Sequence, residues 1–285
     1  MKLSELSTGS IEELRRQRLS EGAAPNTIDN EVKVLSRIYH LARDVWKVAL
    51  PTEPVSFTKF NPRGKLRYFT PDEEAAILAE LDPNRPVPWR ARNGSTGTYR
   101  PEPGSLVYQQ MQDNYDLAVF LLDTGARYSE AGTVPWVCID TIHWEWIDLY
   151  RSKNDTETRL TMTDRLREVL QRRRLGPGGN GAYIFPSYCE EGADAPRGKS
   201  TRALRAAISR AGCNEPPLVK RYGRATVHTF RDTFASRLVQ NGVTLYEVQH
   251  LLGHSDPRQT QKYAKLAPNQ TASKAAQVLN RLAAE

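Results

Sequence analysis

Apolar residues recur at three- and four-residue steps along much of the chain, which is the spacing of amphipathic helices. The clearest stripe runs for five turns from Pro25, with apolar residues at Ile28, Val32, Leu35, Ile38, Leu41 and Val45. A shorter helix is predicted before it, from Ser10 to about Gly22, with the Ser10 hydroxyl as its cap. The two segments predict a small helical domain at the N-terminus.

Prolines and a glycine between residues 51 and 64 mark an extended linker. We therefore expect two domains, one over residues 1–63 and one over residues 64–285. Just after the linker, Thr70-Pro71-Asp72-Glu73-Glu74 combines a side-chain cap, a proline at the first helical position and an acidic first turn. This combination predicts a helix that reaches about Leu81.

The remainder of the second domain is predicted to be mostly helical with a small sheet. Alternating apolar and polar residues indicate strands within residues 137–162, with a turn at 154–157. Residues 83–104 contain five prolines and three glycines and are expected to form a long loop. Helices are expected over residues 109–123, 164–174, 200–211, 229–241, 244–252 and 257–264. The predicted fold class is mainly α, with a helical N-terminal domain and a mostly α second domain that contains a small antiparallel β-sheet.

Composition narrows the classes of function. Of 285 residues, 39% are hydrophobic and 26% charged, as in soluble globular proteins, and no run approaches the ~20 apolar residues of a membrane-spanning helix. The first residues mix charges into every turn and lack the apolar centre of a secretory signal. Three widely spaced cysteines favour neither a disulfide framework nor a zinc knuckle, so a reducing, cytoplasmic location without a bound metal is expected.

Basic charge is concentrated in one part of the chain. The net charge is +7, but residues 165–231 alone contain 14 basic and 5 acidic residues, while residues 68–164 have a net charge of −8. This asymmetry favours a nucleic-acid partner, although a solvated basic surface explains it about equally well. In the 83–104 loop, contact with DNA and a purely structural role are about equally supported for Trp89, Arg90, Arg92, Tyr99 and Arg100.

Chemically capable side chains gather in the C-terminal third. His228 and Arg231 are three residues apart at the start of a predicted helix, so both project from one face. His254 follows the glycine that ends the next helix, and Tyr263 lies nine residues further on. Any one of these residues alone is more often structural than catalytic. Short packed helices would nevertheless bring two histidines, an arginine and a tyrosine together.

In this order, the residues resemble the tyrosine recombinase (phage integrase) family. Thr124-Gly125-Ala126-Arg127-Tyr128-Ser129-Glu130 is similar to the first box of the family, and Arg151-Ser152-Lys153-Asn154 falls where the family keeps a lysine between two strands. His228-Thr229-Phe230-Arg231 matches the second box, and Leu251-Leu252-Gly253-His254 with Thr260 and Tyr263 matches the last. The helix from Asn26 resembles the core-binding domain of the family, so the resemblance covers about residues 10–270. Five motifs in one order are specific, whereas each alone is weak.

The resemblance implies a site-specific DNA recombinase, an enzyme that cleaves and rejoins DNA through a 3′-phosphotyrosine intermediate. Strand exchange would pass through a Holliday junction, in integration, excision, inversion or resolution. The implied partners are double-stranded DNA with specific recombination sites, a homo-tetramer on that DNA and candidate DNA-bending accessory proteins, with no membrane. The protein would be cytoplasmic and associated with the nucleoid when bound to DNA.

The resemblance also assigns the two domains. Residues 1–63 would form the core-binding domain, about one helix shorter than usual, and residues 64–285 the catalytic domain. The two would clamp the duplex, with the basic 165–231 stretch lining the catalytic side. A C-terminal tail helix is expected at 269–285, where it would dock on a neighbouring subunit or on its own domain.

The implied catalytic residues are Arg127, Lys153, His228, Arg231, His254 and Tyr263. Two guanidinium groups can each hold two oxygens of a phosphate, and a tyrosine is a nucleophile whose covalent step is reversible. The lysine would protonate the leaving 5′ oxygen, and His228 would assist proton transfer at the tyrosine. His254 would donate a hydrogen bond to the phosphate in the transition state. No cofactor and no metal are implied.

Two further residues and several alternative functions bear on this interpretation. Glu130 is interpreted as a buried partner that positions Arg127. Asp232 stands where many relatives have a histidine, and its charge would temper the arginine pair or engage a neighbouring base.

The alternatives are a catalytically silent DNA-binding regulator of the same fold and a type IB topoisomerase-like or resolvase-like strand transferase. A basic RNA-binding protein is a third, without an aromatic RNA-binding motif to support it.

Overall fold

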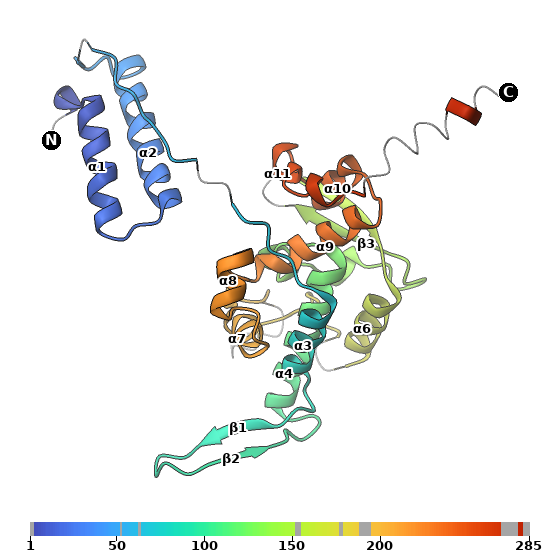
Figure 1. The fold of residues 1–285 in the computed structure, drawn as a ribbon. Coiled ribbons are helices and arrows are strands. Elements are labelled where there is room, and N and C mark those ends of the chain that lie inside the picture. The colour runs from blue at the N-terminus through green and yellow to red at the C-terminus, as the bar shows by residue number, and fades with distance from the viewer. Residues whose placement is uncertain are drawn as a thin grey trace. The chain divides into compact units, whose positions relative to one another are not determined.

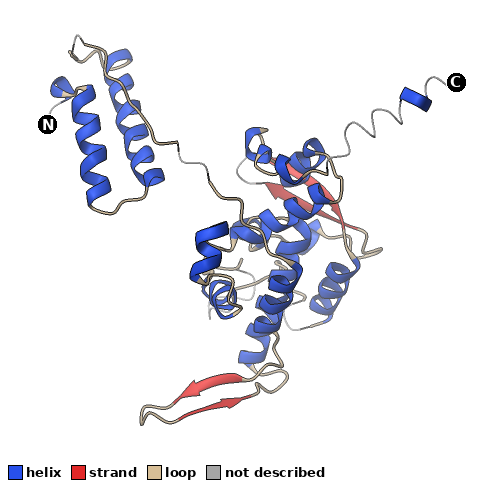
Figure 2. Cartoon of the chain, viewed as in Figure 1, coloured by secondary structure: helices blue, strands red, loops and turns tan. Residues whose placement is uncertain are grey.

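The chain divides into two compact units, residues 1–65 and residues 66–285 (Figure 1). Helices predominate, and the strands of the second unit form two antiparallel pairs (Figure 2). The predicted fold class, mainly α with a small antiparallel sheet, is confirmed. The structure is a computed structural model that describes residues 3–51, 53–61, 64–151, 155–176, 179–187, 195–268 and 279–281.

The first unit consists of two helices and an extended return segment. After a short helix, η1 (Leu3–Glu5), come α1 (Thr8–Ser20) and α2 (Pro25–Asp44). The return segment is fixed to α2 because Asp29 accepts hydrogen bonds from the backbone N–H groups of Phe60 at 2.8 Å and Asn61 at 2.9 Å. The core of the unit is formed by Leu6, Ile11, Ile28, Val32 and Tyr39.

Both predicted helices of the first unit are present, with two corrections at their ends. The cap of α1 is Ser7 rather than Ser10: the Ser7 hydroxyl accepts from the Ser10 backbone N–H at 3.1 Å, and the two side chains form a capping box. Val45, expected on the buried stripe, is 63% exposed because α2 ends at Asp44, one residue earlier.

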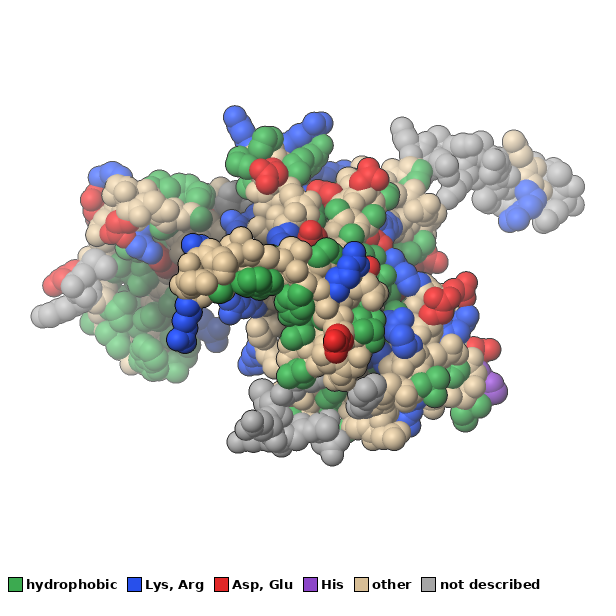
Figure 3. Space-filling view, turned by 90° about the horizontal axis from the view of Figure 1, so that it is seen from below, with side chains coloured by type: hydrophobic (Ala, Val, Ile, Leu, Met, Phe, Trp, Pro, Cys, Tyr) green, Lys and Arg blue, Asp and Glu red, His purple; other side chains and the backbone are tan. Residues whose placement is uncertain are grey.

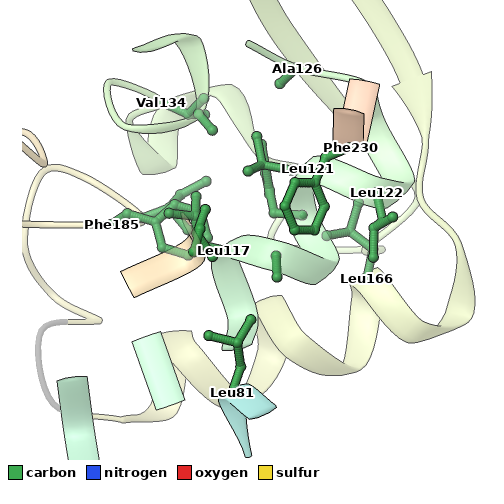
Figure 4. Packing of buried hydrophobic residues seen from close by; sticks show 14 of the residues in the cluster. Leu81, Leu117, Leu121, Leu122, Ala126, Val134, Leu166, Phe185 and Phe230 are labelled. Atoms are coloured by element: carbon green, nitrogen blue, oxygen red, sulfur yellow. The ribbon is translucent and has the colours of Figure 1, made fainter. Parts of the chain in front are cut away.

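The second unit is arranged around α4 (Leu106–Thr124), most of whose second half is buried. Leu117 and Leu121 of α4 point toward Phe185 and Phe230, in the centre of the core (Figure 4). The other helices of this unit are α3 (Pro71–Leu81), α5 (Tyr128–Ala131), η2 (Trp136–Cys138), α6 (Asp164–Leu175), α7 (Arg202–Arg210), α8 (Pro216–Tyr222), α9 (His228–Gln240), α10 (Leu245–Leu252), α11 (Arg258–Gln261) and η3 (Ala264–Leu266).

The predicted strands within residues 137–162 are β3 (Trp146–Arg151) and β4 (Thr156–Thr161). They pair antiparallel with Arg151 opposite Thr156 at the hairpin end. Ile147, Leu149 and Arg151 alternate along β3 and are all buried, so the last inward position of this strand is an arginine. The turn predicted over 154–157 is placed too late, because Thr156 and Glu157 already belong to β4 and pair with Arg151 and Tyr150. Residues 152–154 lie outside the described part of the chain.

The long loop predicted over residues 83–104 is wrong, because this segment contains a β-hairpin. Strand β1 (Val87–Arg90) pairs antiparallel with β2 (Thr96–Tyr99), and the ribbon projects from the helices (Figure 1). Trp89 lies across Gly97, where a Cβ atom would be 2.8 Å from the indole nitrogen. The prolines that suggested a loop flank the strands or, at Pro88, lie in an exposed pair that tolerates a missing N–H donor.

Three further differences concern the C-terminal half. The helix α8 was not predicted, although its Pro216-Pro217 start is a recognised signal. The helix expected over 257–264 is instead one turn of α11, followed by η3. Of the expected tail helix at 269–285, only residues 279–281 lie within the described part of the chain, and they are helical. No described helix is both long and apolar enough to cross a membrane.

The acidic and basic stretches of the sequence pair with each other in the folded unit. At least seven of the 14 basic residues in 165–231 form ion pairs, and all their partners are carboxylates of the acidic 68–164 stretch. These seven are Arg165, Arg167, Arg172, Arg173, Arg197, Arg210 and Arg231. At least half of the basic residues in this stretch are therefore paired with carboxylates of the protein itself.

Helix α10 ends at a glycine that we expect to be sensitive to substitution. Gly253 has φ +62°, and a Cβ atom there would lie 2.7 Å from Cγ of buried Arg151. Gly253→Ala should therefore lower the free energy of unfolding by about 1–2 kcal/mol for the backbone conformation and by a further ~1–3 kcal/mol for displacing the arginine. Urea unfolding measures both. Gly104→Ala is the matched control because Gly104 has φ +87° with no atom within 4 Å of its Cβ position. Equal losses in the two variants would contradict the steric argument.

Candidate active site

One buried carboxylate, that of Glu130, lies among three arginines. The backbone N–H of Arg127 donates to Glu130 Oε2 at 2.8 Å, and the Arg127 guanidinium donates to Oε1. Arg151 Nη1, at the end of β3, donates to Oε2 at 2.9 Å. Arg231 Nη1, on α9, lies 3.9 Å from the same oxygen. The interpretation of Glu130 as a buried group that holds Arg127 agrees with this geometry, and the carboxylate holds Arg151 as well.

Two helix ends complete the environment of the buried arginines. Gly125 at the end of α4 and Gly253 at the end of α10 both have the left-handed conformation. Arg231 donates to the carbonyl of Gly125 and to that of Leu252, each at 2.6 Å, and Arg151 donates to the carbonyl of Leu251 at 2.6 Å. The last carbonyls of a helix have no partner within it and carry partial negative charge, so a guanidinium satisfies both requirements.

The cluster of Glu130, Arg127, Arg151 and Arg231 carries an excess of positive charge. Burial lowers the pKa of Arg231 to about 10, and the charges of Arg127 and Arg151 act in the same direction. Burial would raise the pKa of Glu130, but hydrogen bonds from Arg127 and the charge of Arg151 outweigh it, and the pKa lies below its ordinary value. Three guanidiniums against one carboxylate leave about two positive charges, so the cluster favours an anionic ligand. Arg127 is the member that reaches the surface, with 21% of its side chain exposed.

Tyr263 is buried beside this cluster, with 1% of its surface exposed. Its ring packs with apolar side chains of α9 and α10, namely Ala235, Val239, Val248 and Leu252. Its hydroxyl donates to Asp232 Oδ1 at 2.6 Å, and Lys262 Nζ donates to the same oxygen at 2.6 Å. Burial raises the pKa of the Tyr263 phenol far above its ordinary value, and the charge of Asp232 raises it further.

The two histidines of the motifs lie close to the same charges. His254 is half-buried, and its Nδ1 pairs with the Thr260 hydroxyl at 2.9 Å. Burial and then the charges of Arg231 and Arg127 lower the pKa of His254 to about 3. His228 is exposed at the first position of α9, where neighbouring protein atoms still desolvate its imidazole and lower its pKa. Both imidazoles are therefore neutral at neutral pH.

The structure thus brings together five of the six residues that the sequence singled out. Arg127, His228 and Arg231 are near enough for their charges to act on His254, and Arg231 also acts on Tyr263. Lys153 lies outside the described residues. Within the described part of the chain, no group of three or more His, Cys, Asp or Glu side chains is placed to hold a metal ion.

Sequence reasoning did not identify two contributors to this site. Arg151 appeared only as the first residue of a motif, and its signal is its register: it continues the inward-facing positions of β3. Asp232 was noted as a departure from the family pattern, but its direct contact with Tyr263 depends on how α9 and residues 262–263 pack. Neither contact follows from local spacing.

Comparison with known proteins assigns the chain to a family. Residues 106–270 match the model of the phage integrase family, and the chain belongs to that family, the tyrosine recombinases. It is 34% identical over 148 residues to tyrosine recombinase XerD of Brucella abortus, covering 50% of this chain and 45% of that protein. It is 23% identical over 254 residues to the integrase of Escherichia phage P2, covering 88% and 58%. The chain therefore spans about half the length of these curated relatives.

A solved structure shares the fold. The chain aligns with the XerH site-specific recombinase bound to its difH substrate, with a TM-score of 0.65 and 18% sequence identity, covering 96% of this chain and 71% of XerH. At this identity the likeness concerns the fold alone. It agrees with the order of elements that positions the arginine cluster and Tyr263.

Removing the charge of Glu130 should destabilise the second unit. We expect Glu130→Gln to lower the free energy of unfolding by about 3–5 kcal/mol, because buried arginines would lose their counter-charge. The pKa of Glu130 is lowered by folding, so its contribution is complete above the ordinary carboxyl pKa of about 4.5 and is lost as the pH falls through the lower folded value.

Urea unfolding at neutral pH and under acid conditions measures both effects. The acid-dependent loss of stability should be smaller in Glu130→Gln than in the natural protein. Glu168→Gln is the matched control because Glu168 is exposed on α6. If the two variants unfold alike, Glu130 does not have the structural role described.

Proposed function

We propose that the protein is a site-specific DNA recombinase that cleaves and rejoins DNA through a 3′-phosphotyrosine intermediate. The observation that carries the proposal is the Glu130-centred cluster, in which Arg127, Arg151 and Arg231 exceed their single carboxylate beside a tyrosine hydroxyl. A phosphodiester would supply the missing negative charge. Its five-coordinate transition state is more negative still and would be stabilised more strongly.

The roles of the side chains follow from their contacts. Arg127 retains exposed guanidinium donors after binding Glu130 and could hold the non-bridging oxygens. Arg231, which the family pattern pairs with Arg127, is buried with Nη1 and Nη2 donating to backbone carbonyls, and it adds positive charge to the same site. Tyr263 would attack the phosphorus, which forms the protein–DNA bond and releases a 5′ hydroxyl. By the family pattern, Lys153 would protonate that leaving oxygen.

His254 suits the role of a neutral hydrogen-bond donor. Its pKa of about 3 keeps the ring uncharged at neutral pH. If the Thr260 hydroxyl donates to Nδ1, the proton of the ring is carried by Nε2. That N–H could donate to a phosphate oxygen without adding another positive charge to the cluster.

Double-stranded DNA is the proposed partner of this protein, and XerH, which shares the fold, is a site-specific recombinase solved in complex with its difH substrate. Besides the paired arginines, the second unit has an open groove lined by Arg202, Arg205 and Arg224 together with hydroxyl groups such as those of Thr201 and Ser209. Guanidinium and hydroxyl groups are typical contacts of the phosphate backbone.

We further propose that residues 1–63 and 64–285 clamp the duplex. Four protomers would exchange strands through a Holliday junction, with DNA-bending accessory proteins as candidate partners. The site of action would be the cytoplasmic nucleoid.

The covalent link tests the chemistry directly. Labelled DNA spanning the flanks of the protein's own gene is incubated with the protein without metal and quenched with SDS. We expect protein-linked 3′ ends with the natural protein and none with Tyr263→Phe, which keeps the ring but lacks the nucleophile. Tyr246→Phe is the matched control, because Tyr246 is 80% exposed on α10, and it should form the link normally. Specific binding without any link, even on a nicked substrate, would favour a DNA-binding regulator.

The exposed hairpin is a second feature that we expect to contact DNA. Residues 83–101 contain four arginines and no acidic residue, and Trp89 and Tyr99 are 43% and 44% exposed; Figure 3 views the molecule from this side. In the antiparallel register, Arg90 and Thr96 share one face of the ribbon, and Trp89 shares the other with Gly97. One face is therefore basic and hydroxylated, as phosphate contacts require.

Replacing two hairpin arginines should weaken DNA binding without affecting its sequence preference. For Arg90→Ala/Arg92→Ala, we expect the slope of log K against log salt to fall by up to about 2, because each lost phosphate contact removes about 1. Fluorescence anisotropy at several salt concentrations measures this slope. Arg159→Ala/Arg167→Ala is the control, since these arginines pair with Asp148 and Asp164. Identical slopes in the two double variants would exclude the hairpin from the DNA interface.

A further inference from the structure

The hydroxyl of Tyr263 has a carboxylate as its partner. Asp232 follows Arg231 on α9, and its side chain is 14% exposed. Its Oδ1 atom accepts from Tyr263 Oη and from Lys262 Nζ, each at 2.6 Å. Among the described residues, Asp232 is the only hydrogen-bond acceptor in contact with Tyr263 Oη.

The groups around this contact are otherwise neutral or basic. His228 and Arg231 approach from α9, Lys262 from the residue beside the tyrosine, His254 from the segment after α10, and Arg127 from the start of α5. The other carboxylate of the site, Glu130, is bound to arginines. Within the described ranges, Asp232 is therefore the one anionic group placed to take a proton from the phenol.

The phenol needs such a group because it is not ionised in advance. Burial raises the pKa of Tyr263 far above neutrality, and Asp232 contributes to that rise. A phenol is a weak nucleophile, whereas a phenolate is an effective one. The proton must consequently leave while the bond to phosphorus forms, and it must move to an atom already within hydrogen-bonding distance.

We propose that Asp232 accepts the Tyr263 proton during attack, the role that the family pattern gives to His228. The inference rests on the proposed recombinase function. The Oη–P bond forms as the P–O5′ bond breaks, and the Oη proton passes to Asp232 Oδ1. The leaving O5′ keeps its bonding pair and takes a proton from the general acid. Rejoining reverses each transfer, and Asp232 returns its proton to the tyrosine.

The charges around Asp232 favour transfer of the Tyr263 proton during the attack on phosphorus rather than before it. A carboxylate beside a phosphate is repelled by it, and Lys262 at 2.6 Å offsets the repulsion before reaction. As the phosphorus gains negative charge, protonation removes the negative charge of Asp232. His228 lies one turn earlier on the same helix, where it neighbours the proposed base and does not contact the phenol among the described residues.

Single-turnover cleavage of a nicked substrate at saturating protein tests the proposal. We expect Asp232→Asn, which keeps the shape and the hydrogen bond, to slow formation of the covalent link by about 10²–10⁴-fold without weakening DNA binding. Asp232→Glu should recover part of the rate, and His228→Asn should lose less than Asp232→Asn. Asp164→Asn, at a carboxylate that is 91% exposed on α6, is the matched control and should be unchanged.

A second substrate separates the two proton transfers. With sulfur in place of the bridging 5′ oxygen, the leaving group needs no proton. A variant defective in protonating the leaving group, such as Lys153→Ala, should regain its rate, whereas Asp232→Asn should stay slow. A merely structural effect would not distinguish the two substrates in this way.

Three other results would overturn the proposal or the function on which it rests. Asp232→Asn cleaving as fast as Asp164→Asn, or faster, would overturn the proposal and make Asp232 only a restraint on the tyrosine. A larger loss in His228→Asn than in Asp232→Asn would return the role to the histidine. Absence of a covalent link with the natural protein would overturn the proposed recombinase function, an outcome distinct from failure of the aspartate alone.

Discussion

Three guanidinium groups, two of them fully buried, surround one carboxylate and constrain much of the second unit. Such charges are costly to remove from water unless each donor finds a partner. Glu130 supplies part of that compensation, and the carbonyls at the ends of α4 and α10 supply much of the rest. The left-handed glycines at 125 and 253 are what let both helices stop where their carbonyls meet an arginine. The same arginine contacts therefore cap the ends of α4 and α10, pack the two helices together and hold the positive charge of the cluster in place.

This arrangement also explains why the motifs are scattered along the sequence. The start of α5, the end of β3, α9 and the segment after α10 each contribute one part of the site. The core beneath them, from α4 to Phe230, keeps these ends in register. Tyr263 differs from the arginines because apolar packing, together with one hydrogen bond to Asp232, fixes it. The arginine cluster and the apolar packing of Tyr263 thus meet along α9.

The sequence predicted features whose cause is local and missed those that depend on tertiary contact. Helix α3 was evident because Thr70 and Glu73 form a capping box around a first-turn proline. The motif order brought out the arginines, histidines and tyrosine of the site. The hairpin β1–β2 was missed because prolines outweigh a short, exposed strand pattern. Burial of Arg151 and the contact of Asp232 with Tyr263 both join residues that are more than 20 positions apart, so no local pattern reports them.

The ion pairs between the acidic and basic stretches bear on how the protein is made. Arg165, which pairs with Glu74, is synthesised 91 residues after it, and Arg210, which pairs with Glu80, is synthesised 130 residues after it. The acidic stretch, with a net charge of −8 over residues 68–164, is therefore synthesised before the basic stretch that pairs with it. Self-repulsion should keep that segment open and soluble until its cationic complement arrives. Glu74 and Glu80 cannot form these ion pairs until the chain has been synthesised as far as Arg165 and Arg210.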